Sequence, residues 1–95
     1  MTSPIEEDWR YQNAELLRGQ AFEWKAYRPY SADWTHDHCA GCMAELATVE
    51  TESGALHEGW AVSAAYKHGA EYEWVCAECF ELLEQPLSWT RVDPQ

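Results

Sequence analysis

The sequence predicts one small α+β domain that spans residues 1–95. Three observations indicate this class: a helix-start signal near the N-terminus, alternation of apolar and polar residues in the middle of the chain, and two Cys-x-x-Cys pairs. A chain of this length buries a limited fraction of its surface, so a crosslink or a bound metal ion contributes much of the stability. We expect an N-terminal helix, antiparallel β-hairpins and a short C-terminal helix.

The N-terminal segment has the signals of a helix over residues 4–18, with an interruption near residues 12–13. Ser3 suits the capping position, Pro4 suits the first helical position, and Glu6 lies three residues after Ser3, as in a capping box. The glycine that follows, at position 19, is a typical helix stop. The residues expected to share the apolar face are Ile5, Trp9, Leu16 and Leu17.

The rest of the chain alternates between strand and helix signals. Phe22, Trp24 and Ala26 alternate with the charged residues Glu23 and Lys25, which indicates a strand with one buried face. The other expected elements are a short helical segment over 43–50, two antiparallel strands over 56–66 and 71–75, a helix over 77–85 and a short closing strand over 87–90. The aromatic residues expected in the core are Trp9, Trp24, Trp34, Trp74 and Phe80, while Trp60 and Trp89 are left open between core and surface.

The four cysteines form the strongest chemical signal. Cys39 and Cys42 make one Cys-x-x-Cys pair, and Cys76 and Cys79 make the second, 33 residues further on. A two-residue gap lets both sulfurs of a pair face one point, and two such pairs supply the four ligands of a tetrahedral Zn²⁺ site. The sequence therefore predicts a zinc-ribbon-like domain in which Cys39, Cys42, Cys76 and Cys79 hold a structural zinc ion.

Alternatives to this site remain open at the level of sequence. A four-thiolate site also accepts iron, and oxidation of the empty site would give two disulfides. His36 and His38 flank Asp37 just before the first pair, so one of them can replace a cysteine or contribute to a second site. The simpler interpretation is that these histidines support the cysteine ligands through hydrogen bonds.

The charge of the chain restricts its partners. Seventeen acidic residues against six basic ones give a net charge of −11, and four thiolates around Zn²⁺ make the molecule more negative still. Such a field repels phosphate backbones and anionic lipids, which argues against nucleic acid and membrane surfaces as partners. The charge fits either a well-solvated acidic surface or electrostatic steering toward a basic protein. The N-terminus lacks the pattern of a signal peptide, and we expect a cytoplasmic protein.

No grouping of residues typical of a catalytic site stands out, so we do not expect an enzyme. Four thiolates leave no open position on the metal, which makes the predicted site structural. His57 and Glu58 are adjacent, but the second histidine of a metalloprotease motif does not follow at helical spacing. His68, beside a glycine, indicates a loop.

Several joined motifs resemble a family of small bacterial zinc-ribbon-like proteins. The matching segments here are Asp8-Trp9-Arg10, Leu17-Arg18-Gly19, Trp34 to Cys42, Leu56 to Trp60, and Trp74 to Phe80. The resemblance covers nearly the whole chain and implies the metal site, with His36, Asp37 and His38 as groups that support it. It implies no particular activity. The chain differs around the end of the first cysteine pair, where it has Gly41 and Met43 in place of aromatic residues.

These observations favour a zinc-stabilised, acidic protein-interaction domain. The form we favour is an inhibitor or immunity-type partner of a basic protein such as a nuclease toxin. A stand-alone regulatory zinc ribbon that docks on the transcription or translation machinery is the alternative, and a metal-handling protein or enzyme that uses the histidines is a third hypothesis.

Overall fold

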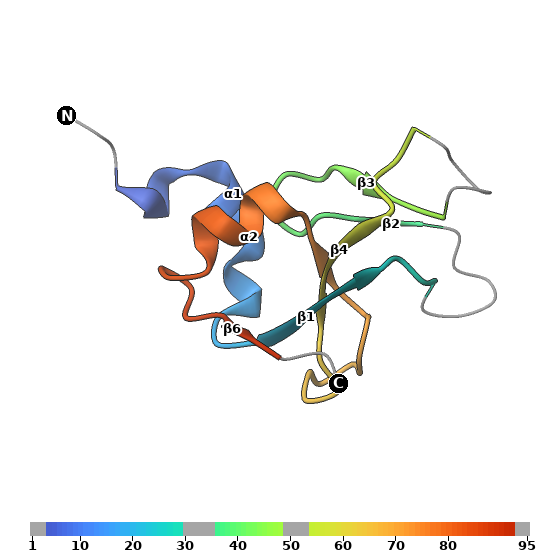
Figure 1. Ribbon diagram of the computed structural model, residues 1–95. Helices are drawn as coiled ribbons and strands as arrows, with labels where there is room; N and C mark the ends of the chain where they lie inside the picture. The colour runs from blue at the N-terminus through green and yellow to red at the C-terminus, as the bar shows by residue number, and fades with distance from the viewer. Residues whose placement is uncertain (1–3, 30–35, 49–53, 93–95) are drawn as a thin grey trace.

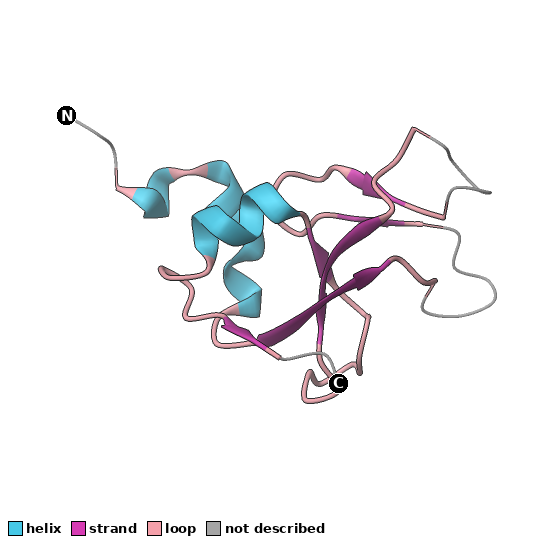
Figure 2. Cartoon of the chain, viewed as in Figure 1, coloured by secondary structure: helices cyan, strands magenta, loops and turns pink. Residues whose placement is uncertain are grey.

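The computed structural model describes residues 4–29, 36–48 and 54–92, and has the predicted α+β class (Figure 1). The helical segments gather on one side of the molecule and the strands on the other (Figure 2). The helical segments are η1 (Ile5–Glu7), α1 (Trp9–Ala14), η2 (Glu15–Leu17) and α2 (Ala77–Leu83). The strands are β1 (Ala21–Ala26), β2 (Asp37–His38), β3 (Glu45–Leu46), β4 (Glu58–Val62), β5 (Trp74–Val75) and β6 (Thr90–Arg91).

The N-terminal helix is confirmed, but it is divided into three short pieces. Asp8 has an extended backbone between η1 and α1, and its side chain caps α1 by accepting a hydrogen bond from the Arg10 amide at 2.8 Å. The helix tightens to 3₁₀ geometry after Ala14, so the second interruption comes slightly later than predicted. Gly19 ends the segment with a φ of 78°, a conformation that glycine adopts without strain. The predicted cap Ser3 lies outside the described residues.

The buried face of this segment differs from the predicted one. Tyr11, Ala14 and Leu17 are buried, whereas Trp9 and Leu16 are exposed. Tyr11 and Ala14 are three residues apart in α1 and share a helical face, and the 3₁₀ geometry that begins at Glu15 continues the spacing of three to Leu17. The prediction that Trp9 lies in the core is therefore wrong, and 54% of its surface is exposed.

The main sheet contains four strands in the order β5-β4-β1-β6. The predicted hairpin is confirmed: β4 and β5 are antiparallel, with Trp60 opposite Val75. Both strands are shorter than predicted because the intervening residues form turns, in which the Tyr66 amide donates to the Ser63 carbonyl at 3.0 Å. Strand β1 pairs antiparallel with β4, and β6 adds to the other edge of β1 in parallel.

The remaining elements follow the predictions in part. The segment expected to be helical over 43–50 instead contains β3, which pairs with β2 and buries Leu46; positions 49 and 50 lie outside the described residues. The helix predicted at 77–85 is confirmed as α2. The closing strand is also confirmed but begins at Thr90, because Ser88 has a positive φ of 56° and the Trp89 amide bonds back to the Glu84 carbonyl.

The aromatic core follows the predictions in part. Trp74 and Phe80 are fully buried, as predicted, and Trp89 joins them with its indole N–H donating to the Leu17 carbonyl at 2.9 Å. Trp60 is partly buried and stacks on Phe80 with ring centroids 4.1 Å apart. The prediction for Trp24 is wrong because the side chain is 39% exposed. Trp34 lies outside the described residues.

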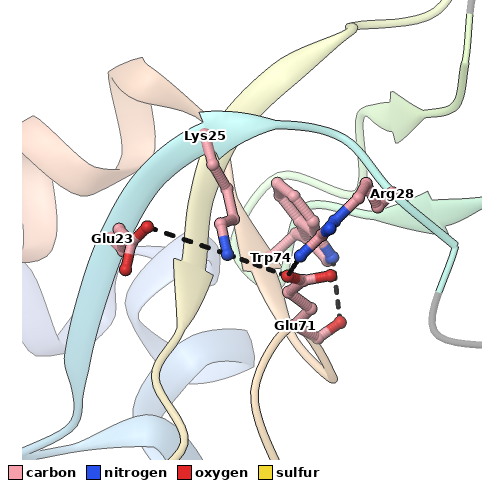
Figure 3. Close-up of polar contacts among 5 residues, drawn as sticks. All are labelled: Glu23, Lys25, Arg28, Glu71 and Trp74. Carbon is pink, nitrogen blue, oxygen red and sulfur yellow. Dashed lines mark hydrogen bonds and ion pairs between the residues drawn. The ribbon is translucent and has the colours of Figure 1, made fainter. Parts of the chain in front are cut away.

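An ion-pair network joins β1 to the loop that precedes β5 (Figure 3). The Glu71 carboxylate accepts a hydrogen bond from Lys25 Nζ at 2.8 Å and another from Arg28, while its backbone carbonyl accepts the Trp74 indole N–H at 3.0 Å. Burial by itself would raise the pKa of Glu71, but the hydrogen bonds from Arg28 and Lys25 lower it. Glu71 has a positive φ of 66°, so these contacts hold a backbone conformation that is unfavourable for this residue.

We expect Glu71→Gln to reduce the free energy of unfolding by about 1 kcal/mol, because it replaces charged hydrogen bonds with neutral ones. The folded-state pKa is lowered, so the contribution is present above the unfolded pKa of about 4.3 and is lost as the pH falls through the folded value. Urea unfolding of both proteins in excess metal ion measures the difference. The control is Glu23→Gln, which touches Lys25 only at 3.7 Å and is expected to change stability by less than about 0.5 kcal/mol. Equal effects of the two variants would contradict the role of Glu71.

Candidate metal centre

The structure brings the four predicted ligands together. The Sγ atoms of Cys39, Cys42, Cys76 and Cys79 all lie within 4.8 Å of one another, and the Cys42 and Cys76 sulfurs are 3.7 Å apart. All four cysteines are free, so no disulfide competes for the sulfurs. Among the described residues this is the group of side chains that can hold a metal ion.

The first pair lies on a tight turn between β2 and β3. The Met43 amide donates to the Cys39 carbonyl at 2.9 Å, and the Cys39 amide donates to the Ala44 carbonyl at 2.8 Å. Met43 closes this turn with a φ of 68°. Because the turn is closed by backbone hydrogen bonds, the two sulfurs are directed to the same point.

The second pair lies where β5 meets α2. Cys76 is the N-cap of the helix, and its sulfur accepts a hydrogen bond from the Cys79 amide at 3.5 Å. Cys79 is in the first turn of α2 and is buried. The helix start therefore fixes the spacing of these two ligands.

Backbone contacts join the two pairs. The Ala40 amide donates to the Trp74 carbonyl at 2.8 Å, and Cys39 forms a β-bridge with Trp74, two residues before Cys76. The Cys76 amide then donates to the Cys39 sulfur at 3.3 Å. The chain between the two pairs thus passes through β3, β4 and β5, and these contacts bring its two ends together at the metal centre.

The geometry fits a tetrahedral four-thiolate site. With metal–sulfur bonds of about 2.3 Å, as for zinc, the sulfurs of a tetrahedron lie about 3.8 Å apart, close to the 3.7 Å between Cys42 and Cys76. The amides of Gly41 and Cys76 both donate to the Cys39 sulfur at 3.3 Å, which stabilises negative charge on it. Four sulfur ligands complete such a site and leave no position for water.

The thiols influence one another strongly. The pKa of Cys39 lies far below its ordinary value, mainly because its thiolate accepts hydrogen bonds from the Cys76 and Cys79 thiols. The hydrogen bond to Cys39 in turn raises the pKa of Cys76 to about 11 and raises that of Cys79 as well. A cation that binds here must displace protons from the latter two thiols, so its affinity rises with pH.

Helix α1 supplies two groups around the centre that motif spacing did not indicate. Asn13 Nδ2 donates to the Gly41 carbonyl at 2.9 Å and so links the helix to the first pair. Arg10 forms an ion pair with Asp8 at 2.9 Å, and the negative sulfurs of Cys79 and Cys42 add to the effect of Asp8 in raising its pKa. The one signal for Arg10 was its place in the Asp8-Trp9-Arg10 segment.

The histidines are not part of the cysteine cluster. His36 and His38 are exposed, and their rings contact each other at 5.0 Å, with His38 in β2. Asp37, between them, accepts a hydrogen bond from the Tyr27 hydroxyl at 2.9 Å. His57 lies just before β4, where its Nδ1 is 2.9 Å from the Ala47 carbonyl oxygen. These contacts fix the histidine segments within the fold, apart from the four cysteine sulfurs.

The fold and the site define the class of the protein: a small α+β domain with a four-cysteine cluster, as in zinc-ribbon-like domains. No family model, no curated protein and no solved structure matches the chain. The resemblance to small bacterial proteins therefore stays a prediction. In the described parts of the chain, no helix has the length and apolar character needed to cross a membrane.

We expect Gly41→Ala to weaken metal binding at least tenfold and to destabilise the metal-bound domain by roughly 1–3 kcal/mol. A Cβ at this position would lie 2.9 Å from Cys79 Sγ and 3.2 Å from Cys79 Cβ, so a ligand would have to move. Competition with a chromophoric chelator measures the affinity.

Gly19→Ala is the matched control for this substitution. Position 19 has a φ of 78°, which is unfavourable for alanine, but a Cβ there meets nothing within 4 Å. We expect it to cost about 1 kcal/mol of stability and to leave metal affinity unchanged. Wild-type affinity in Gly41→Ala would contradict the close packing of Gly41 against the site.

Proposed function

We propose that this protein is a zinc-stabilised, acidic protein-interaction domain whose partner is a basic protein. In its most specific form, it is an inhibitor or immunity-type partner of a basic protein such as a nuclease toxin. The observation that carries the proposal is the distribution of charge over the folded chain, and not the metal centre, which serves to maintain the fold.

The basic side chains are largely neutralised within the molecule. Five of the six form ion pairs with carboxylates among the described residues; these five are Arg10, Arg18, Lys25, Arg28 and Arg91. Among the described residues, five carboxylates take part in these ion pairs, and the chain as a whole has eleven more acidic than basic residues. A field of this sign accelerates encounter with a basic protein and repels nucleic acid.

Zn²⁺ is the ion that we propose for the cysteine cluster. The donor set is four thiolates, the sulfur spacing fits zinc, and three of the four cysteines are buried. A closed site of this type contributes folding energy and no catalytic position. This chemistry supports a binding role in preference to an enzymatic one.

We expect one zinc ion per chain by elemental analysis of protein purified without added metal. Removal of the ion by a strong chelator is expected to abolish the cooperative unfolding transition, because the binding free energy of such sites, about 10–16 kcal/mol in peptides, is comparable to or exceeds the net stability of a domain. Near-ultraviolet circular dichroism, which reports the packed Trp74 and Trp89, follows the loss. Iron in place of zinc, or an unchanged spectrum after chelation, would contradict the proposal.

We expect the zinc-loaded protein to capture a basic protein from cells that produce it, more strongly at low salt than at about 0.15 M. Salt screens the attraction between the acidic surface and a basic protein, and this lowers the association rate. Mass spectrometry identifies the captured protein, and binding of the two purified proteins is then measured across the same salt range.

The control is an unrelated acidic domain of similar size and net charge. Capture of the same proteins by both would indicate non-specific attraction and contradict the proposal. Capture of polymerase or ribosomal assemblies would instead favour a regulatory zinc ribbon of the transcription or translation machinery.

A further inference from the structure

An open groove of about 600 Å³ lies beside the metal centre. Trp24 of β1 and Leu56, just before β4, supply apolar surface to it. Cys42 and Cys76 line it with ligands from both cysteine pairs, and Glu58 and Glu78 contribute carboxylates. We call this surface the Trp24 groove. It exists only because the metal centre, the edge of the sheet and the start of α2 meet at one place.

The apolar part of the groove is exposed and held in position. Trp24 and Leu56 are 39% and 41% exposed, although both are large apolar side chains. The Trp24 ring contacts the Trp60 ring edge-to-face, with centroids 5.6 Å apart, and the two residues are paired across β1 and β4. An exposed ring that is fixed in this way offers a flat surface for binding at low entropic cost.

The charge of the groove is of one sign. Glu58 at the start of β4 and Glu78 in the first turn of α2 are exposed, and neither forms an ion pair within the described residues. Lys25 is next to Trp24 in β1, but successive side chains of a strand point to opposite faces. Figure 3 shows Lys25 directed toward Glu71 and Glu23, with which it forms ion pairs. Among the described residues no lysine or arginine lines the groove, and Arg91, which lines a neighbouring hollow, is paired with Glu84.

We propose that the Trp24 groove binds an arginine side chain, presented by a segment of the basic partner together with a neighbouring apolar residue. This inference rests on the proposed function and names the surface that would carry it. The guanidinium stacks on the Trp24 ring and pairs with the carboxylates of Glu58 and Glu78, and the apolar residue covers Leu56.

The chemistry of the groove favours this occupant over others. Arginine combines a planar face that stacks on an indole with donors that match a carboxylate, whereas lysine offers a compact point charge. Nucleic acid would bring phosphates to two carboxylates and to a negatively charged metal–thiolate centre. A second copy of the chain brings another net charge of −11. An arginine-bearing segment removes the repulsion and buries the exposed indole.

The test uses a short amidated peptide, Leu-Arg-Leu-Arg, added to the nitrogen-labelled, zinc-loaded protein and followed by NMR. We expect binding in the millimolar range or tighter, with the largest shifts at the Trp24 indole N–H and at the amides of Glu58 and Ala77, next to Glu78. The same peptide with lysine is expected to bind more weakly. A peptide with citrulline, which keeps the shape of arginine without its charge, is expected not to bind measurably.

Matched variants separate the groove from the general acidity of the chain. Glu58→Gln with Glu78→Gln is expected to weaken peptide binding about fivefold to tenfold. Glu6→Gln with Glu7→Gln removes the same charge from the exposed η1 segment, which does not line the groove, and is expected to change binding less than about twofold. All four of these glutamates are exposed, so both double variants are expected to keep the zinc-loaded fold. Their NMR spectra report whether they do.

Three results would overturn the inference: no binding of the arginine peptide in the millimolar range, shifts spread over the whole acidic surface, or equal weakening by the two double variants. Failure of the groove and failure of the proposed function give different results. A basic protein that still binds Glu58→Gln with Glu78→Gln at full affinity refutes the groove alone. Specific binding of the peptide without capture of any basic protein refutes the proposed function alone.

Discussion

The joining of the two cysteine pairs is the constraint on which the rest of this structure depends. The hydrogen bond from the Ala40 amide to the Trp74 carbonyl places the first pair against the strand that leads into the second. Once the pairs are in contact, the chain between them must leave and return, and it does so through β3 and β4. A metal ion at this junction would hold together parts of the molecule that are far apart in sequence, which is where a crosslink restricts the unfolded chain most.

Besides the metal centre, an aromatic core between α2 and the sheet holds the structure together. Phe22 of β1 contacts both Phe80 of α2 and Trp89 near the C-terminus, with ring centroids 5.5 and 4.8 Å apart. Arg91 covers this cluster, since its guanidinium lies 5.3 Å from the Trp60 ring and pairs with Glu84. Large rings allow a small domain to bury apolar area with few residues. The parallel pairing of β6 with β1 brings Arg91 to this place.

The two faces of strand β1 make different contacts. Lys25 meets Glu71 on one face, with Arg28 nearby, and these contacts fix the loop before β5 (Figure 3). Trp24 lies on the other face, where it lines the groove with Glu58 and Glu78, and Arg91 lines a neighbouring hollow that shares Trp24. Five of the six cations thus form ion pairs within the described parts of the molecule, while the chain keeps a net charge of −11.

The sequence by itself determined the α+β class, the four cysteines of the centre, the hairpin of β4 and β5, and the helix that follows Cys76. These depend on local spacing: two residues between cysteines, alternation along a strand, and a helix that ends before Pro86. Local spacing failed where long-range contacts decided the outcome. Residues 43–50 have helical composition, but pairing with β2 and burial of Leu46 made part of them a strand.

Only the tertiary structure decided which aromatic residues are buried and what surrounds the metal centre. Trp9 and Trp24 have the character of core residues, yet the N-terminal segment buries Tyr11, Ala14 and Leu17 instead, and Trp24 stays 39% exposed although its ring contacts Trp60. The same assembly places Arg10 and Asn13 beside the cysteines and opens the Trp24 groove. The metal ligands could be predicted from short sequence motifs because each pair of cysteines is close together in the sequence. The burial of a side chain and the charges around it could not be predicted in this way, because they depend on which segments far apart in the sequence pack together.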